Sequence, residues 1–346
     1  MKERIDLNPG WTREEVAALT ARPELKIVQY SEHNIPDVNL MQTLNEELFA
    51  NRPDVTFRIY GFHSQSGDLS VLKYMNHVEK LVIDCNRRIN GIEGIGEWLR
   101  LKEFAFDVFE AESLDVLALL PTTLQQLRIG KTKTKKTDLS VLNRFTELET
   151  LSVNGHTTNI ETIGTLSSLR SLYISGMPLK ELGYLKDVTD LSELHLSFGG
   201  AENLDSLAEV KSLQLLKLLR VKGLSDLSVL PELKGLRLLG IEDQPHLTSL
   251  PSLENLTELQ RVFLNNVNVE SIDWAKTSKS LKELALLQMK HITAEDIESL
   301  IHHKSLERMI VHLKSAKQQK VAKQAIMAAG MWDESGWWYN DKSLNI

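Results

Sequence analysis

The chain has 346 residues, a formal net charge of −7 and one cysteine, Cys85. With 40 basic and 47 acidic residues, it has no positive excess to attract nucleic acid or an anionic membrane surface, and we expect neither as a partner. A lone cysteine excludes an internal disulfide, and the first residues lack the apolar stretch of a secretion signal, so we expect a cytoplasmic protein.

The first part of the chain, residues 1–53, predicts an N-terminal cap with a divergent leading repeat. Residues 25–30 and 55–60 alternate apolar with other side chains, as strands do, and the segment between them has the spacing of an amphipathic helix. Thr12 is followed three residues later by Glu15, which is the pattern of a helix capping box. These elements would seal the first exposed edge of the core.

A leucine pattern, L-x-x-L-x-L, recurs at nearly constant spacing within residues 54–313. The steps between units run from 21 residues (Leu148 to Leu169) to 25 residues (Leu281 to Leu306). The units begin at Val78, Leu101, Leu124, Leu148, Leu169, Leu191, Leu213, Leu236, Leu259, Leu281 and Leu306. A period in the twenties predicts an α/β solenoid, in which each unit adds one strand to a parallel sheet on the concave face of an arc.

The segments between the predicted strands are short. About 14 residues separate one strand from the next, which leaves room for 3₁₀ or irregular structure on the convex side. Two segments have helical apolar spacing instead, 112–124 and 292–306, and in the second Thr293 and Asp296 resemble a helix N-cap. We therefore expect helices at these two places.

Residues 314–346 predict a C-terminal helical cap followed by a tryptophan-rich tail. The first half has the pattern of a helix that ends at Gly330. The second half holds three of the six tryptophans of the chain, Trp332, Trp337 and Trp338, which is more aromatic surface than a disordered tail carries. We expect this tail to dock, either as part of the cap or as part of a ligand surface.

Residues 139–153 (LSVLNRFTELETLSV) and 227–241 (LSVLPELKGLRLLGI) resemble the 22-residue leucine-rich repeats of bacterial, internalin-type proteins. The resemblance covers about residues 68–313 and implies a surface that binds another protein. Family repeats usually carry Asn at the ninth position of the unit, where its amide satisfies backbone groups of the turn. Here only Asn86 does so, and the other turns must satisfy their backbone in another way.

The candidate site follows from the alternation of side chains along each strand, which projects positions three, five and seven of every unit from the concave face. In the later units these positions hold many apolar residues, flanked by aromatic and basic ones. The residues predicted to bind a partner are Tyr173, His195, Leu215, Lys217, Leu219, Leu238, Arg261, Phe263 and Leu287. An apolar patch of several hundred Å² needs a cover. A protein partner is one candidate for that cover, and the tryptophan-rich tail folded back over the later strands is the other.

The sequence contains no complete motif for a cofactor or a metal ion, and we expect neither. Gly130, Lys131 and Thr132 imitate the end of a phosphate-binding loop, but Gln125 stands where the first glycine is required. No H-E-x-x-H motif and no pair of C-x-x-C motifs provides metal ligands.

These features favour a non-enzymatic module for protein–protein interaction, which binds a protein partner on its concave face. An inhibitor or immunity-type protein that neutralises a toxin or an enzyme, and a scaffold in a signalling assembly, remain open, as does the oligomeric state. The alternative from a different class is an enzyme with residues drawn from distant units, such as His195, Lys217 and Glu242. A strongly shifted pKa of His195 in a closed, deep pocket would favour the enzyme, and a broad open face would favour binding.

Overall fold

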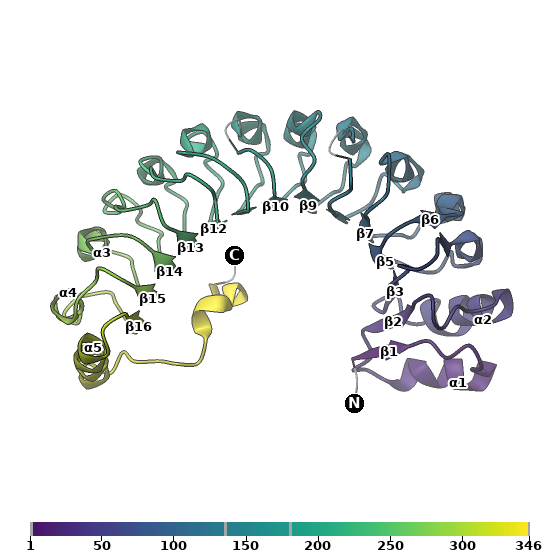
Figure 1. The fold of residues 1–346 in the computed structure, drawn as a ribbon, viewed down its shortest axis with the longest axis horizontal. Helices are drawn as coiled ribbons and strands as arrows, with labels where there is room; N and C mark the ends of the chain where they lie inside the picture. Colours follow the sequence, from purple (N-terminus) through teal and green to yellow (C-terminus); the bar gives the residue numbers. More distant parts are fainter. Residues whose placement is uncertain (1–2, 135–136, 180–181, 345–346) are drawn as a thin grey trace. The chain divides into compact units, whose positions relative to one another are not determined.

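The computed structural model describes residues 3–134, 137–179 and 182–344. The chain divides into two compact regions, Met1–Leu169 (the first region) and Arg170–Ile346 (the second region). Within each region the main strands are parallel and lie on one side of the units, and the helical segments lie on the other side (Figure 1). The prediction of an α/β solenoid built on a parallel sheet is confirmed.

Seven parallel strands lie in chain order in the described part of the first region: β1 (Arg4–Asp6), β2 (Ile27–Tyr30), β3 (Thr56–Tyr60), β5 (Lys80–Asn86), β7 (Glu103–Val108), β8 (Gln126–Ile129) and β9 (Thr150–Asn154). A separate two-stranded sheet joins β4 (Gly67–Asp68) to β6 (Ile89–Asn90). The predicted strands at 25–30 and 55–60 are confirmed as β2 and β3. Strand β1 escapes prediction because three residues are too few to show an alternating pattern.

The helices that precede the regular units are α1 (Arg13–Ala18) and α2 (Val38–Thr43), and a π-helical turn continues α2 over Leu44–Phe49. The predicted capping box is confirmed, because Glu15 N donates to Thr12 Oγ1 (3.3 Å) and Thr12 N donates to Glu15 Oε2 (2.8 Å). The described first region also contains 3₁₀ helices at Leu19–Ala21, Ser70–Tyr74, Ile92–Glu97, Asp115–Leu119, Ser140–Arg144 and Ile160–Thr165.

The helix predicted within residues 112–124 is wrong, since only the 3₁₀ helix Asp115–Leu119 forms there. Its C-terminal neighbour Leu120 is extended, with φ −74° and ψ 153°. Pro121 follows it, and the residue before a proline is pushed out of the α region. The apolar spacing in this segment therefore describes a buried face, but the proline ends the helix before an α-helical turn can develop.

The second region repeats the same plan with longer strands toward its end. Its described strands are β10 (Ser171–Ser175), β11 (Glu193–Ser197), β12 (Leu215–Leu219), β13 (Leu238–Gln244), β14 (Arg261–Val267), β15 (Glu283–Met289) and β16 (Arg308–Leu313). Its described helical segments are the 3₁₀ helices Gly183–Asp187, Asp205–Leu207 and Leu230–Glu232, then α3 (Asp273–Thr277), α4 (Ala294–Glu298) and α5 (Ala316–Ala328). Helix α4 confirms the prediction for 292–306, and Thr293 Oγ1 accepts from Asp296 N (3.2 Å) as its N-cap.

The turns that follow the strands satisfy their backbone without an asparagine ladder. In most units of the second region the eighth residue, just after the outward positions of the strand, is left-handed, with φ of 51° at Phe198 and 49° at Arg220. Phe198 N donates to the backbone oxygen of Leu219 (2.9 Å), and Arg220 N donates to that of Glu242 (3.1 Å). The main chain of the next unit thus replaces the missing side-chain amides, as the sequence required.

Helix α5 closes the last strand, as predicted for the C-terminal cap. It buries Ala322 and Ile326. The amide of Gln319 donates to Val311 O (2.9 Å) and accepts from Leu313 N (2.8 Å), so one side chain satisfies backbone groups of β16 that no further strand pairs with. The core of the units is therefore sealed by the helix itself.

Gly330 follows Ala329, the C-cap residue of α5, and its φ of +74° is the left-handed conformation expected of a C-terminal signal. Two short 3₁₀ helices follow, Trp337–Tyr339 and Asp341–Leu344. None of the helices in the described residues is both long and apolar enough to cross a membrane.

Candidate functional site

The parallel register of the second region brings the predicted site residues into rows. Tyr173 of β10 pairs with His195 of β11, which pairs with Lys217 of β12. Leu215 of β12 pairs with Leu238 of β13, and the same row continues to Arg261, Glu283 and Arg308. All project from the face of the strands that points away from the helical segments, which we call the strand face.

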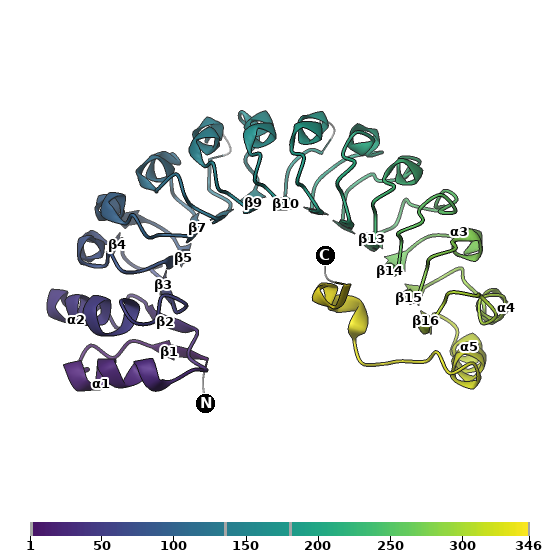
Figure 2. The same ribbon diagram turned by 180° about the vertical axis from the view of Figure 1, so that it is seen from behind.

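The chain after α5 returns over this strand face. We call residues 331–344 the C-terminal segment. It begins against the last strand, where Met309 N donates to Met331 O (2.8 Å) and Trp332 forms a bridge with Met309. Figures 1 and 2, seen from opposite sides, both show the segment lying beside the strands from β16 toward β12.

Aromatic side chains of the C-terminal segment bury the apolar part of the strand face. Trp337 and Trp338, which are 5% and 9% exposed, form one cluster with Phe263, Ala285, Leu287 and Ile310. Leu344 forms a second cluster with Leu215 and Leu238. Between them, the ring of Tyr339 lies edge-on to that of Phe263, with centroids 5.3 Å apart. Of the two covers considered for the apolar patch, the internal one is present.

Five of the predicted partner-binding residues are buried, namely Arg261, which is described below, and four apolar residues. Leu215, Leu238, Phe263 and Leu287 are at most 6% exposed. They cannot contact another protein while the C-terminal segment is in place, and their role in binding stays a prediction.

Charged groups hold the same segment at defined points. Arg261 is fully buried, and it donates through Nε to Glu283 Oε2 (2.6 Å) and through Nη1 to Asn340 O (2.9 Å). Its guanidinium carbon lies 5.3 Å from the ring centroid of Trp337. Lys217 Nζ donates to Asp341 Oδ2 (2.5 Å). The predicted residues Arg261 and Lys217 thus bind a peptide segment of their own chain.

Arg308 and Glu283 belong to this network and were absent from the predicted site. Arg308 pairs with Glu283 and, at 3.4 Å, with Asp333, and its guanidinium lies 5.2 Å from the ring centroid of Trp337. Both residues occupy the third position of their units, where the sequence indicates solvated charge. The apolar residues of the same rows and the three tryptophans were the sequence signals that this position would be covered.

The remaining predicted residues, Tyr173, His195 and Leu219, lie on β10, β11 and β12. Tyr173 and His195 stack with ring centroids 4.2 Å apart, and both are half-buried, as is Leu219. Burial, and then the charge of Lys217, lower the pKa of His195 to about 4. Burial raises the pKa of Tyr173, with Glu193 adding to the effect. At neutral pH His195 is therefore an uncharged ring and a weak base, which suits packing and hydrogen bonding better than proton transfer.

The strand face of the first region carries charged side chains that pair with one another. Asp84 accepts from Arg58 Nε (2.7 Å) and Nη2 (3.2 Å), and Arg128 approaches the same carboxylate at 3.4 Å. Burial raises the pKa of the neighbouring Asp107. In this region the outward charged side chains form ion pairs between different strands.

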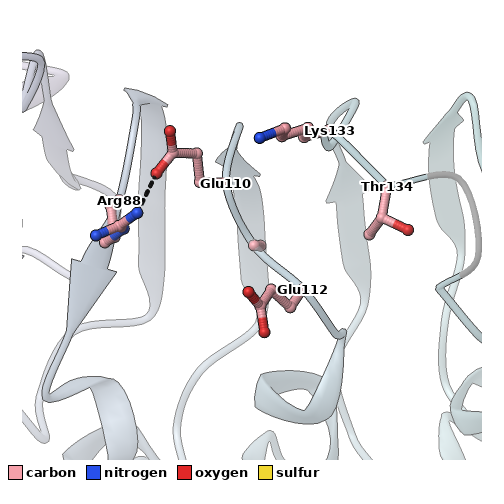
Figure 3. A pocket seen from close by; sticks show the side chains of 6 residues that line it. Arg88, Glu110, Glu112, Lys133 and Thr134 are labelled. Atoms are coloured by element: carbon pink, nitrogen blue, oxygen red, sulfur yellow. Dashed lines mark hydrogen bonds and ion pairs between the residues drawn. The ribbon is translucent and has the colours of Figure 1, made fainter.

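An open hollow of about 640 Å³ lies at the strand ends of the first region. Figure 3 shows Arg88, Glu110, Glu112 and Lys133 around it, with an ion pair of 2.7 Å between Arg88 and Glu110. The cations and carboxylates are balanced, so the hollow has no strong charge preference. His195, Lys217 and Glu242 do not line it, and within the described residues no group of three His, Cys, Asp or Glu could hold a metal ion.

Comparison with known proteins bears on the fold. No protein-family model matches the sequence, and no curated protein matches it. Among solved structures, a leucine-rich repeat protein of Leptospira interrogans, LIC12759, aligns with a TM-score of 0.55 at 15% identity, over 93% of each chain. This protein has the leucine-rich repeat fold. The resemblance to such repeats predicted from the leucine pattern is confirmed.

A second leucine-rich repeat structure that resembles this protein is an internalin, InlF, of Listeria monocytogenes. It aligns with a TM-score of 0.49 at 18% identity, over 91% of this chain and 87% of the internalin. At these identities the likeness extends to the fold alone. We therefore infer the function of this leucine-rich repeat protein from its own residues.

Proposed function

We propose that this leucine-rich repeat protein is a non-enzymatic recognition module that binds another protein on its strand face, in the cytoplasm. The observation that carries the proposal is the half-buried Tyr173–His195 stack on β10 and β11, which lies on the second region's strand face beside Glu193 and Lys217. Tyrosine and charged side chains on a rigid sheet are typical anchors of protein interfaces. Because the strands hold these side chains in place, little ordering cost opposes binding.

The same residues support binding better than catalysis. A general base works best with a pKa near the operating pH, and His195, with a pKa of about 4, is too weak a base to take up a proton efficiently at neutral pH. Glu242, the carboxylate of the alternative enzyme site, already accepts from Asn265 Nδ2 (3.1 Å). We therefore assign this face to recognition and no chemical step to it.

Site-specific photo-crosslinking tests the proposal. A benzophenone amino acid replaces Ser175, which lies on β10 two residues from Tyr173, in the full chain. The control carries the same group at Lys186, an exposed residue of the 3₁₀ helix Gly183–Asp187 on the other side of the units. Both proteins are irradiated in extract of the cells that make the protein.

We expect one protein adduct from the Ser175 position that is absent from the Lys186 position. Tyr173→Ala in the Ser175 background should reduce the adduct at least about 5-fold, as for an interface anchor. An adduct formed equally from Lys186, or one that Tyr173→Ala leaves unchanged, would contradict binding on the strand face.

A further inference from the structure

We propose that the strand face of β12–β16 is a binding surface for an acidic peptide that carries adjacent tryptophans, and that the C-terminal segment occupies it as a displaceable internal ligand. The inference rests on the proposed function, because the displacing peptide would belong to the protein partner. The segment itself, MWDESGWWYNDKSL at 331–344, gives the chemistry that the surface selects.

The C-terminal segment is not needed to close the core. Helix α5 already covers the last strand, with Ile326 buried and Gln319 bonded to backbone groups of β16. The segment instead runs across the strand face, a surface that the repeat plan leaves outside the core. Its release would expose apolar side chains but would leave the units and their terminal helix intact.

The contacts of the segment are those of a bound peptide, with a few anchors at separate points. Trp337 and Trp338 fill the cluster around Phe263, and Leu344 occupies a second one. Between these, the backbone oxygen of Asn340 accepts from Arg261 Nη1 (2.9 Å). Most protein–peptide interfaces are built from such a small set of buried anchors.

Charge complementarity defines the kind of peptide. Two carboxylates of the segment meet cations of the strand face, Asp333 with Arg308 (3.4 Å) and Asp341 with Lys217 (2.5 Å). A third, Glu334, meets Lys323 of helix α5 (2.8 Å). Two arginines also lie against the ring of Trp337, where a cation is attracted to the aromatic face. A basic or purely aliphatic peptide would lack both kinds of contact.

The segment does not satisfy the surface completely. Trp338 Nε1 and Asp341 Oδ1 are buried without a hydrogen-bond partner among the described residues. A buried polar atom that leaves water without gaining a partner weakens the contact. A peptide that keeps the tryptophans and supplies the missing partners would therefore bind more tightly than the segment does.

Displacement of the segment would be detected through the apparent Kd of a free peptide, because the tethered segment and the peptide compete for one surface. A tethered segment acts at an effective concentration of about 1 mM. For a free peptide with an intrinsic Kd of about 10 μM, the tethered copy occupies the surface about 99% of the time and raises the apparent Kd to about 1 mM. Weakening only the tethered copy about 10-fold lowers the apparent Kd to about 0.1 mM, whereas weakening the surface for both leaves it near 1 mM.

Substitution of Asp341 weakens the tethered copy only, whereas substitution of Lys217, its ion-pair partner, weakens the surface for both copies. The probe is a fluorescein-labelled peptide of residues 331–344, and its polarisation is titrated with full-length protein. Asp341→Lys loosens only the tethered segment, and we expect about 10-fold tighter peptide binding than in the wild type. Lys217→Glu weakens the surface for both copies, and we expect an unchanged apparent Kd. A peptide with alanine in place of Trp337 and Trp338 is the control and should not bind.

A cleavable version of the full chain provides a second measurement. A protease site is inserted between Glu334 and Ser335, which are both exposed. Cleavage there separates most of the C-terminal segment from the rest of the chain. The cleaved protein should bind the labelled peptide about 100-fold more tightly than the uncleaved protein. Equal binding by Asp341→Lys and the wild type, equal gains in both variants, or no binding by the cleaved protein would overturn the proposal.

The peptide titration contains no partner, so its outcome is independent of the crosslinking experiment. Peptide binding without any Ser175 adduct would leave the displaceable segment intact and remove the proposed function. An adduct without peptide binding would do the reverse.

Discussion

The two regions of the molecule treat the same strand-face positions in opposite ways. In the first region the outward rows hold charged residues that form ion pairs from one strand to another, as Asp84 does with Arg58 and Arg128. In the second region the corresponding rows hold Leu238 and Phe263, and the C-terminal segment covers them. Side chains at these positions have no role in the core of the units, so their chemistry decides whether the face stays open. Charged rows tolerate water, and apolar rows require a cover.

The largest difference between the regions should appear when one arginine is removed from each. Arg261→Ala leaves Glu283 buried with a single remaining cation, and we expect a loss of about 3 kcal/mol in the free energy of unfolding. Arg128→Ala removes a half-exposed ion pair and should cost under about 0.5 kcal/mol. Urea titration of both variants measures the difference. Equal losses would show that the second network is no more buried than the first.

The pH dependence of stability should contain a term from His195. Burial lowers its folded pKa to about 4, below the ordinary 6.5, so between these values the unfolded chain binds a proton that the folded chain does not. The stabilising term is complete above pH 6.5 and is lost as the pH falls toward 4. Between pH 7.5 and 4.5 we expect His195→Phe to lose about 2 kcal/mol less stability than the wild type, as measured by urea titration. Parallel losses in both proteins would contradict this burial.

Asp84 should contribute more to the stability of the first region than the more exposed ion pair of Lys80 and Glu103 does. Asp84→Ala removes two hydrogen bonds from Arg58, and we expect a loss of about 1.5 kcal/mol in the free energy of unfolding. Glu103→Ala, which breaks the pair with Lys80 (2.8 Å), is the matched control and should cost about 0.5 kcal/mol. Thermal unfolding followed by circular dichroism compares them. A larger loss at Glu103 would refute the ranking.

The helix caps should be the feature that the two regions share. Thr12 and Thr293 each close a capping box, so Thr12→Ala and Thr293→Ala should each cost about 1 kcal/mol of unfolding free energy. Serine at either position keeps the hydroxyl and should restore most of this stability. The expectation fails for a position where serine is as destabilising as alanine.

The sequence predicts what the local period controls. The leucine spacing locates the strands of the repeats and the residues of each outward row, and the local pattern at Thr12 and Thr293 locates two helix N-caps, because these features depend on neighbours within one or two units. The failure at 112–124 is also local, since Pro121 interrupts an otherwise helical pattern.

The leucine period does not predict which residues of the C-terminal segment contact the strand face. Lys217 and Asp341 are 124 residues apart, and no periodic signal relates them. The sequence showed that the apolar rows needed a cover and that the tail carried enough aromatic surface to supply one. It could not choose between this tail and a partner, because both would bury the same side chains.

Carbodiimide crosslinking tests most directly whether the C-terminal segment occupies the strand face in solution. The reagent joins an amine to a carboxylate only when the two are in contact, and Lys217 Nζ lies 2.5 Å from Asp341 Oδ2. Lys80 and Glu103, at 2.8 Å, are the internal reference in the first region. An equal mixture of ¹⁴N- and ¹⁵N-labelled protein identifies the source of each crosslink by mass spectrometry. We expect a Lys217–Asp341 crosslink within single chains, in yield comparable to the reference. A reference crosslink without the Lys217–Asp341 product, or with that product only between chains, would contradict it.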